Sequence, residues 1–587
     1  MTLLWIWTLP LLAAGALHGH RYAAHEEVKI IANKVGPFNN PSETYEYYSL
    51  PFCSKNKKKR HEDFGEGLVG DRRIAAPYEI TFLDHAPWRL LCERVYSRSD
   101  LKSFTRAIEN DYYFEMFIED LPMWGYVGEV EGEDVLLGPL ENVRRYIYPH
   151  LVFSIGYNAD QIVSVNVSTN PARKVDITDM YDGTPVTFSY SVEWVPRPDL
   201  KYSERMSRYH DSRFLPGTFE IHWLSIINSF VLVLLLTAFL TIIMMRVLKN
   251  DFSRYMEVEE DELGEEETGW KLINGDVFRF PPLSNALAAM VGSGTHLFVV
   301  TFLLLTCAIC GFFVPTKRGA ILTAMIVLYA VASPVGGFVS GRLYRQLTGD
   351  AWLANALLAV LVFPAPLVAV FAWVNSVALA HGSSAALPAS AVAGIVALFA
   401  LVALPLGLAG ALVGRHTATD FKAPTRTTRV PREIPDDAPW YRSPPAQTFM
   451  AGFLPFSAIY IELHYIFASV WGHKIYTLFG ILFLAFVMLI VVTAFITVSL
   501  VYFQLAREDY RWWWRSLLYG GATGAFIYAY SFFYFFNRSN MAGMIQGSFY
   551  FGYMAIISYA FFLMLGAVGF LASCAFVTHI YSVVKAD

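Results

Sequence analysis

The sequence predicts a polytopic α-helical membrane protein with nine transmembrane helices and an N-terminal lumenal domain that is β-rich and β-sandwich-like. Of the 587 residues, 55% are hydrophobic and 16% are charged, a balance typical of a membrane protein that carries one aqueous domain. Long apolar stretches follow one another from Ile221 to the C-terminal end, whereas the residues before Ile221 are polar and rich in aromatic side chains. This division predicts a head followed by a membrane domain.

The chain starts with an apolar segment, Met1 to Leu17, that ends in small residues. The pattern is typical of a secretory signal peptide, which we predict to cover residues 1–24, with cleavage between Gly19 and Ala24. No Lys or Arg precedes the apolar segment, so an uncleaved anchor is the alternative. Both alternatives place the following domain in the lumen of the secretory pathway.

Residues 25–219 form the predicted lumenal domain. Val163–Ser168 and Phe188–Trp194 alternate between apolar and polar side chains, which is the pattern of half-buried strands in an antiparallel sheet. Asp100, followed by apolar residues at helical spacing, predicts an N-capped amphipathic helix. Two further strands are predicted at residues 78–83 and 151–157.

Three residues of this domain point to covalent chemistry. Cys53 and Cys92 are its only cysteines, and an oxidising lumen favours a disulfide between them, with two buried free thiols as the alternative. Asn166 begins the sequence Asn-Val-Ser, an acceptor for N-glycosylation, and the strand alternation places it on the solvent face.

Nine apolar segments within residues 220–579 reach the length of about 20 residues that crosses the hydrocarbon core. Their predicted ranges are 223–247, 287–313, 320–341, 353–379, 389–413, 447–471, 476–502, 517–536 and 548–577. Between them lie an acidic loop at residues 249–285 and a second polar loop at residues 415–445. Residues 580–587 form a short charged tail.

Positive charges orient these spans, because Lys and Arg gather in cytosolic loops. The loops after the odd-numbered spans carry most of them, at Arg246, Lys249, Arg254, Arg342, Arg345, Arg415 to Arg442, Arg507, Arg511 and Arg515. Nine spans that start from a lumenal head then leave the tail in the cytosol. The run Trp512–Trp514 between arginines predicts an anchor at headgroup depth.

Prolines and closely spaced glycines recur inside the spans, with the glycine pairs at Gly337/Gly341, Gly410/Gly414 and Gly520/Gly524. Prolines kink helices, and small residues let two helix backbones approach closely. Two interpretations are open. The pairs serve ordinary packing within the bundle, or they form a groove that receives a transmembrane helix of another protein.

Glu462 is the most unusual residue within a predicted span, because it carries a carboxyl group, and His464 lies two residues further on. A carboxyl group at this depth costs about 2.5–3.5 kcal/mol unless it is paired, neutralised or hydrated. Glu462 therefore either protonates and bonds to a neighbouring helix or lines a polar cavity. Two residues on a helix are about 200° apart, so Glu462 and His464 do not form a dyad by themselves.

The sequence offers little for other classes of function. A net charge of -5 without a basic stripe argues against nucleic acid as a partner. Nucleotide, metalloprotease and serine-hydrolase motifs are absent, so we predict no enzyme activity, no cofactor and no metal site. Cys307 and Cys310 lie within an apolar span, where packing is favoured over metal or redox chemistry.

Motifs spread over the whole chain resemble the transmembrane 9 superfamily, or nonaspanins, and most closely its member 3 and member 1 branches. Two local departures are His464, where the family often has Tyr, and the alanine-rich third to fifth spans. The motifs that carry the resemblance are Asn33-Lys-Val-Gly-Pro37, Asn40-Pro41, Tyr45, Leu50-Pro-Phe-Cys53, Gly70-Asp71-Arg72, Tyr112-Tyr-Phe-Glu115, Leu121-Pro122, Gly125, His222-Trp223-Leu-Ser-Ile-Ile-Asn228, Gly269-Trp270-Lys271, Gly275-Asp-Val-Phe-Arg279, Leu454-Pro-Phe456, Ile461-Glu462, Glu508-Asp-Tyr-Arg-Trp512 and the final Lys585-Ala586-Asp587.

The resemblance implies a Golgi and endosomal protein that escorts membrane-protein cargo with glycine-rich transmembrane helices toward the cell surface, and so supports adhesion. It also implies that Lys585 and Asp587 form a sorting signal read by the COPI coat for Golgi retention. The expected partners are client membrane proteins, the COPI coat and the lipid bilayer. The alternative is a proton- or ion-coupled small-molecule transporter or channel that uses Glu462. An intramembrane enzyme ranks last.

Overall fold

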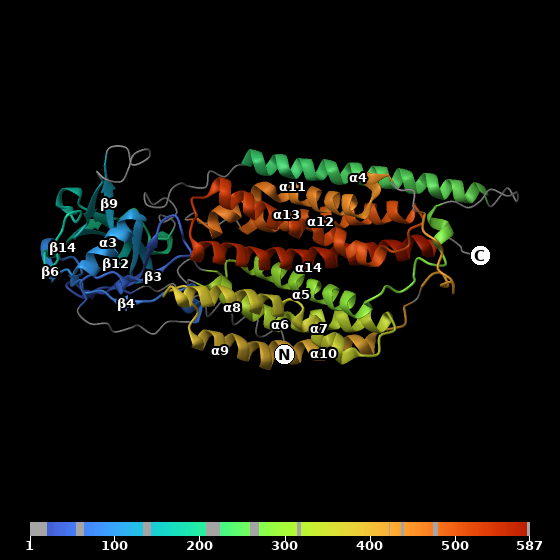
Figure 1. Cartoon of the computed structure of the whole chain (residues 1–587), viewed down its shortest axis with the longest axis horizontal. Helices are drawn as coiled ribbons and strands as arrows, with labels where there is room; N and C mark the ends of the chain where they lie inside the picture. Colours follow the sequence, from blue (N-terminus) through green and yellow to red (C-terminus); the bar gives the residue numbers. More distant parts are fainter. Residues whose placement is uncertain are drawn as a thin grey trace.

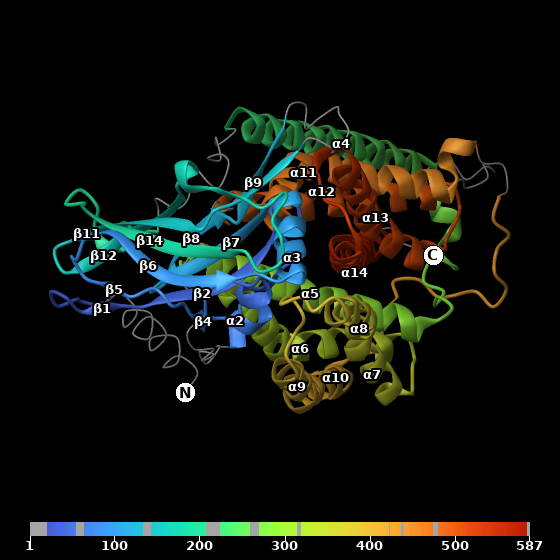
Figure 2. The same ribbon diagram turned by 60° about the vertical axis from the view of Figure 1, so that its left-hand side comes forward.

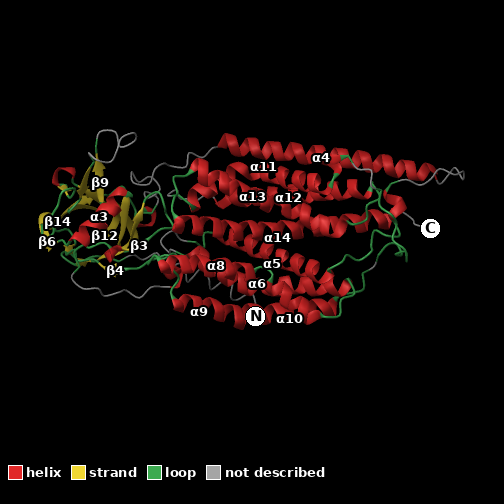
Figure 3. Cartoon of the chain, viewed as in Figure 1, coloured by secondary structure: helices red, strands yellow, loops and turns green. Residues whose placement is uncertain are grey.

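A β-rich head lies at one end of a long bundle of helices in the computed structural model (Figure 1). Strands are confined to the head and the long helices to the bundle (Figure 3). The predicted class, a polytopic membrane protein with an N-terminal β-rich domain, is confirmed. The structure describes residues 20–54, 64–132, 143–206, 223–258, 269–313, 319–421, 423–435, 439–472 and 479–583.

Two larger and two smaller sheets build the head. One larger sheet has the order β12-β11-β14-β6, with β11 and β14 parallel, and the other has the order β3-β2-β7-β8, with β4 beside β2. The smaller sheets pair β1 with β5 and arrange β13, β10 and β9 in that order. The strands are β1 Glu27–Val28, β2 Ile30–Pro37, β3 Tyr45–Glu46, β4 Ile74–Ala75, β5 Ile80–Thr81, β6 Ala86–Val95, β7 Tyr112–Ile118, β8 Leu121–Tyr126, β9 Gly128–Glu131, β10 Arg144–Ile147, β11 His150–Asn158, β12 Gln161–Thr169, β13 Val175–Asp176 and β14 Pro185–Pro196.

Side chains from both larger sheets pack into one hydrophobic core, as in a β-sandwich. Met116 of β7, Phe153 of β11 and Phe188 of β14 are all buried in it. Three predicted strands lie within β11, β12 and β14, whose alternating apolar side chains face this core. The predicted strand at residues 78–83 is wrong in extent, because only Ile80–Thr81 pairs as a strand.

The head begins before the predicted boundary at residue 25. Tyr22 stacks on Phe82, and its backbone N–H donates to the Asp160 carbonyl at 2.8 Å. The predicted helix is α3, Arg98–Glu109, but its N-cap is Ser97 rather than Asp100. Asp100 occupies the third helical position and closes a capping box with Ser97, a role that the same sequence pattern also fits.

The bundle contains all nine predicted segments as helices. Eight of them are long and apolar enough to cross a membrane. The ninth is α13, whose tryptophans, tyrosines and glycines lower its hydropathy and which packs between α11 and α14. The helices are α4 Trp223–Val258, α5 Ser284–Ile309, α6 Ala320–Gln346, α7 Trp352–Leu361, α8 Pro364–Ala380, α9 Ala389–Leu398, α10 Leu404–Thr417, α11 Pro444–Val470, α12 Phe479–Leu505, α13 Trp512–Arg538 and α14 Met544–Val583.

Two predicted spans are interrupted. The span at residues 353–379 breaks into α7 and α8, because Pro364 has no N–H for the helical ladder. The span at residues 389–413 is α9 and α10 joined by a π-helical turn at Phe399–Ala403. The loops are also shorter than predicted, because α4 continues to Val258 and α10 to Thr417.

Helix α14 lies at the centre of the bundle and α4 at its margin. α14 packs against α13, α5, α12 and α8, whereas α4 contacts α12 and α11. Turned by 60°, the bundle shows α14 nearly end-on, with α4 on one side and α9 and α10 on the other (Figure 2). A further short helix of the head, α2 at Phe64–Leu68, packs against α6 and α9.

Candidate functional site

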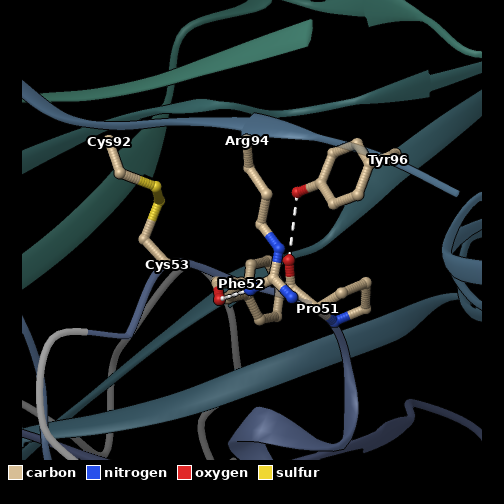
Figure 4. The surroundings of a disulfide bond; sticks show 6 residues. All are labelled: Pro51, Phe52, Cys53, Cys92, Arg94 and Tyr96. Atoms are coloured by element: carbon tan, nitrogen blue, oxygen red, sulfur yellow. Dashed lines mark hydrogen bonds between the residues drawn. A yellow bond between two sulfur atoms is a disulfide. The ribbon is translucent and has the colours of Figure 1, made fainter. Parts of the chain in front are cut away.

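A disulfide fastens the segment after β3 to strand β6 (Figure 4). Cys53 and Cys92 are bonded, with their Cα atoms 6.2 Å apart. Beside the bridge, Arg94 Nη1 donates to the Phe52 carbonyl at 2.7 Å, and the Tyr96 hydroxyl donates to the Pro51 carbonyl at 3.1 Å. The bridge and both hydrogen bonds hold a segment without regular structure against the sheet.

Asn166 lies on the exposed side of β12, between the buried Val165 and Val167. β12 is an edge strand of its sheet. The side-chain amide therefore points away from the core, at a position where a glycan fits without displacing another strand.

A buried polar network occupies the middle of the head. Asn33 Nδ2 donates to Asp71 Oδ1 at 2.9 Å and to Glu115 Oε2 at 2.8 Å, and Asn33 Oδ1 accepts from the Arg72 backbone N–H at 2.7 Å. Buried carboxylates are tolerated only when they are paired and hydrogen-bonded, and this network supplies those partners. Arg72 Nη2 also donates to the Ala386 carbonyl at 2.7 Å, in the connection between α8 and α9.

Two further residues of the head bind the bundle. Asn40 Nδ2 donates to the Ala542 carbonyl at 2.8 Å, and Ala542 N donates back to Asn40 Oδ1 at 3.0 Å. Four residues later, the Thr44 hydroxyl lies 2.8 Å from the Ser384 hydroxyl, and the Thr44 carbonyl accepts from Ser384 N at 2.8 Å. This head clamp, Asn40, Thr44 and Arg72, joins the connection between α13 and α14 to the connection between α8 and α9.

Glu462 and His464 lie on α11 and both face protein. Glu462 is buried, and His464 Nδ1 lies 3.1 Å from the Tyr530 hydroxyl of α13. Tyr530 in turn contacts the rings of Tyr460 and Phe467 edge-on. The intramembrane histidine is thus part of an aromatic cluster between α11 and α13.

The glycine pairs serve packing within the bundle. A side chain at Gly337 would collide with the Gly407 carbonyl, and one at Gly410 with the Pro334 carbonyl, so α6 and α10 approach backbone to backbone. Gly520 and Gly524 meet α14 in the same way. Of the two interpretations, the structure supports close packing of this chain's own helices at these positions.

Helix α4 presents the opposite kind of surface. Val233 and Met244 are buried, while its outer side carries large apolar side chains. Thr237 and Thr241 donate to main-chain carbonyls of their own helix, so these hydroxyls are satisfied. The exposed outer face of α4 consists of Ile227, Val231, Leu234, Leu235, Phe239, Ile242, Ile243 and Met245.

A polar cap closes the end of the bundle that lies away from the head. Asp276, before α5, accepts hydrogen bonds from Arg279 Nε at 3.1 Å, from the Thr428 hydroxyl at 3.0 Å and from Arg432 N at 3.3 Å. Arg432 also forms an ion pair with Glu508. The cap therefore ties together three connections that are far apart in the sequence.

The predicted membrane anchor is wrong for two of its three tryptophans. Trp512 and Trp513 are buried in protein, and Trp512 Nε1 donates to the Val277 carbonyl at 2.8 Å. The motifs around residues 270 and 508 do not predict this contact, because it joins two segments that are 235 residues apart in the sequence. Lys585 and Asp587 lie outside the described residues, and the described part of α14 ends two residues after Tyr581, whose hydroxyl donates to the Trp270 carbonyl at 2.6 Å.

Within the described ranges, no group of three or more His, Cys, Asp or Glu side chains lies close enough to hold a metal ion. Cys307, Cys310 and Cys574 are free thiols.

Comparison with known proteins places the chain in a family. The family model for Endomembrane protein 70 matches residues 44–544. Transmembrane 9 superfamily member 4 of Arabidopsis thaliana is 49% identical over 97% of this chain and 95% of its own length, and member 1 of Bos taurus is 42% identical over 96% and 94%.

"Putative phagocytic receptor 1b" of Dictyostelium discoideum is 43% identical over 97% of this chain and 96% of its own length. No solved structure matches the chain. With a family model over most of its length and relatives aligned nearly end to end, the chain belongs to the transmembrane 9 superfamily.

Proposed function

We propose that this protein escorts membrane proteins with glycine-rich transmembrane helices through Golgi and endosomal membranes toward the cell surface, and so supports adhesion. In this proposal the head is lumenal and the C-terminal end cytosolic. Membership of the superfamily supports it, and the Dictyostelium relative, named as a phagocytic receptor, points to a process at the cell surface.

The observation that carries the proposal is the exposed outer face of α4. Its side chains are bulky: Phe239 is 61% exposed and Ile242 is 63% exposed. Glycines on a client helix leave a shallow groove, and large side chains fill such a groove with many dispersion contacts. The glycine pairs of the escort itself, Gly337/Gly341, Gly410/Gly414 and Gly520/Gly524, already pack against α10, α6 and α14, so in this proposal the client supplies the small residues.

Co-purification tests the client chemistry. A single-span client with a glycine-rich transmembrane helix should co-purify with the full-length chain, and changing those glycines to leucine should abolish capture, because the groove is then filled. A matched client with leucine placed at non-glycine positions of the same helix controls for hydrophobicity. Equal recovery of all three clients would count against the proposal.

The COPI assignment has a separate test. The double change Lys585→Ala with Asp587→Ala should move the steady-state protein out of the Golgi, because the coat reads both charges. Ser582→Ala, just upstream on α14, is the control. An unchanged distribution of the double variant would refute the signal and would leave the client proposal intact.

Glycosylation tests the orientation. Asn166→Gln should remove an endoglycosidase-sensitive mass shift if the head is lumenal. The other acceptor sequence of the chain, Asn537-Arg538-Ser539, ends helix α13, and Asn537→Gln should leave the shift in place. Asn537 lies at the end of α13 that faces the head, so a shift in Asn537→Gln that survives the added change Asn166→Gln would contradict the predicted glycan at Asn166.

A transporter that uses Glu462 is the second candidate. The buried carboxyl on α11, close to the His464–Tyr530 pair, favours it. In liposomes, proton or cation flux that disappears on Glu462→Gln would raise this candidate above the first. Flux at the level of empty liposomes would remove it.

A further inference from the structure

Six buried polar residues lie on α12, α13 and α14, three helices that pack against one another. None of the six side chains is more than 6% exposed. Among the described residues, seven of their polar atoms have no hydrogen-bond partner: Thr493 Oγ1, Gln504 Nε2, Gln504 Oε1, Trp513 Nε1, Thr523 Oγ1, Ser558 Oγ and Ser573 Oγ. We call these residues, Thr493, Gln504, Trp513, Thr523, Ser558 and Ser573, the polar seam.

In the half of the polar seam that lies away from the head, seam residues of α12 and α14 lie on the faces by which these two helices meet. Thr493, Thr497 and Gln504 are four and seven residues apart, so they share one face of α12. Thr497 Oγ1 lies 3.0 Å from the position that a Cβ on Gly569 would take, so this face meets α14. Ser573 is one turn beyond Gly569 on the same face of α14.

The remaining part of the seam follows α13. Gly520 packs against Gly569 of α14, and Gly524 packs against the Ser558 carbonyl. Thr523 stands next to Gly524 and one turn from Gly520. The hydroxyls of Thr523 and Ser558 are therefore at about the same depth in the bundle, toward the head from Thr497.

The chemistry of the seam selects a neutral ligand that both donates and accepts hydrogen bonds. Hydroxyls and the glutamine amide do both, the indole N–H only donates, and no seam residue carries a charge. Lipid offers no such partners to a membrane helix, so buried polar groups must be satisfied inside the protein. A water molecule that contacts two to four of these groups meets the requirement.

We propose that the polar seam binds a file of water molecules between α12, α13 and α14. The file starts at Gln504, at the end of the bundle away from the head, and leads toward Tyr530, which lies seven residues after Thr523 on α13. The Tyr530 hydroxyl lies 3.1 Å from His464 Nδ1. The seam thus gives the interior of the bundle a hydrated route to the half-buried His464, independently of the client surface on α4.

Radiolytic hydroxyl-radical labelling of the full-length protein in lipid nanodiscs tests the proposal, because bound water generates radicals where bulk water does not reach. Leu565 and Leu563 of α14 are both buried, at 0% and 1% exposure. Leu565 is one turn from Gly569 and faces α13, whereas Leu563 is one turn from Ala567 and faces α5. Leu565 should be oxidised at least about three-fold more than Leu563. Equal oxidation of the two would overturn the proposal.

Isosteric variants give a second readout. Thr493→Val with Thr523→Val removes two hydroxyls without changing side-chain shape, and the Leu565/Leu563 ratio should fall toward one. The Tm should fall by about 2–4 °C, because the waters lose partners. Thr237→Val on α4, whose hydroxyl bonds to its own helix, is the control. A higher or unchanged Tm in the double variant would show that the hydroxyls are dry, and would overturn the proposal.

Discussion

The contact between α6 and α10 and the outer face of α4 use opposite surfaces for helix association. At the first, glycines bring two backbones together so closely that a single added carbon would collide with a carbonyl group. At the second, bulky apolar side chains stand out from a helix that is anchored by few buried residues. The difference teaches that small-residue spacing in this chain marks contacts between its own helices, whereas bulky apolar side chains mark the exposed outer face of α4.

Gly337→Ala should disrupt the contact between α6 and α10, and of the variants in this section it should lower the Tm most. The new methyl group would collide with the Gly407 carbonyl, and such overpacking costs about 1–3 kcal/mol. Thermal unfolding of the purified chain in detergent measures it. Gly547→Ala on α14, where a Cβ meets nothing within 4 Å, is the matched control and should leave the Tm unchanged or slightly higher. Equal Tm values for the two variants would contradict the account of close packing.

A buried polar group in the head should make stability depend on pH. His150 Nδ1 lies 2.8 Å from the Ser189 hydroxyl, and burial, followed by the charge of Arg173, lowers the pKa of His150 below its usual value of about 6.5. The unfolded chain then binds this proton more readily, so stability is lost as pH falls below about 6.5.

The Tm of the head transition should therefore drop between pH 7 and pH 5, and His150→Gln should flatten that drop. The same pH slope in both proteins would mean that other groups control it. If His150→Gln flattens the pH dependence of the Tm and leaves client recovery unchanged, the stability of the packed head and the proposed capture by α4 are independent of each other.

Changes on the outer face of α4 should have the smallest effect on stability. Leu235→Ala and Phe239→Ala remove side chains that are 54% and 61% exposed, so the free energy of unfolding should change by less than about 0.5 kcal/mol. Recovery of a glycine-rich client should nevertheless fall. Unfolding curves and co-purification from the same preparation measure both. A large loss of stability would show that this face packs within the protein.

The sequence was most informative where a periodic pattern had one explanation. Strands β12 and β14 followed from alternating residues, and eight of the nine predicted spans followed from apolar length among the described residues. It failed where one pattern fits two structures. Ser97 and Asp100 are both capping residues, and only the path of the chain decides between them. Tryptophans flanked by arginines suit a membrane interface and equally a buried cap, and the contact of Trp512 with Val277 spans 235 residues.

The contacts between head and bundle were likewise beyond the reach of local patterns. Asn40 and Ala542 are 502 residues apart, and each is unremarkable in its own segment. Three residues from motifs that carried the family resemblance, Asn33, Asn40 and Asp71, meet in the head clamp and the network behind it. Their spread along the chain gave no sign of this, because hydrogen bonds between distant loops leave no periodicity to read.

Site-specific photocrosslinking in cells tests the central claim most directly. A photoreactive residue at Phe239 reports on the outer face of α4. One at Leu401, which is 76% exposed in the turn that joins α9 to α10, reports on general lipid-facing contact; α9 and α10 lie on the opposite side of the bundle from α4 (Figure 1). We expect a glycine-rich client helix to crosslink to position 239 and not to position 401. Crosslinks of equal yield at both positions, or at position 401 alone, would contradict the claim that α4 holds the client.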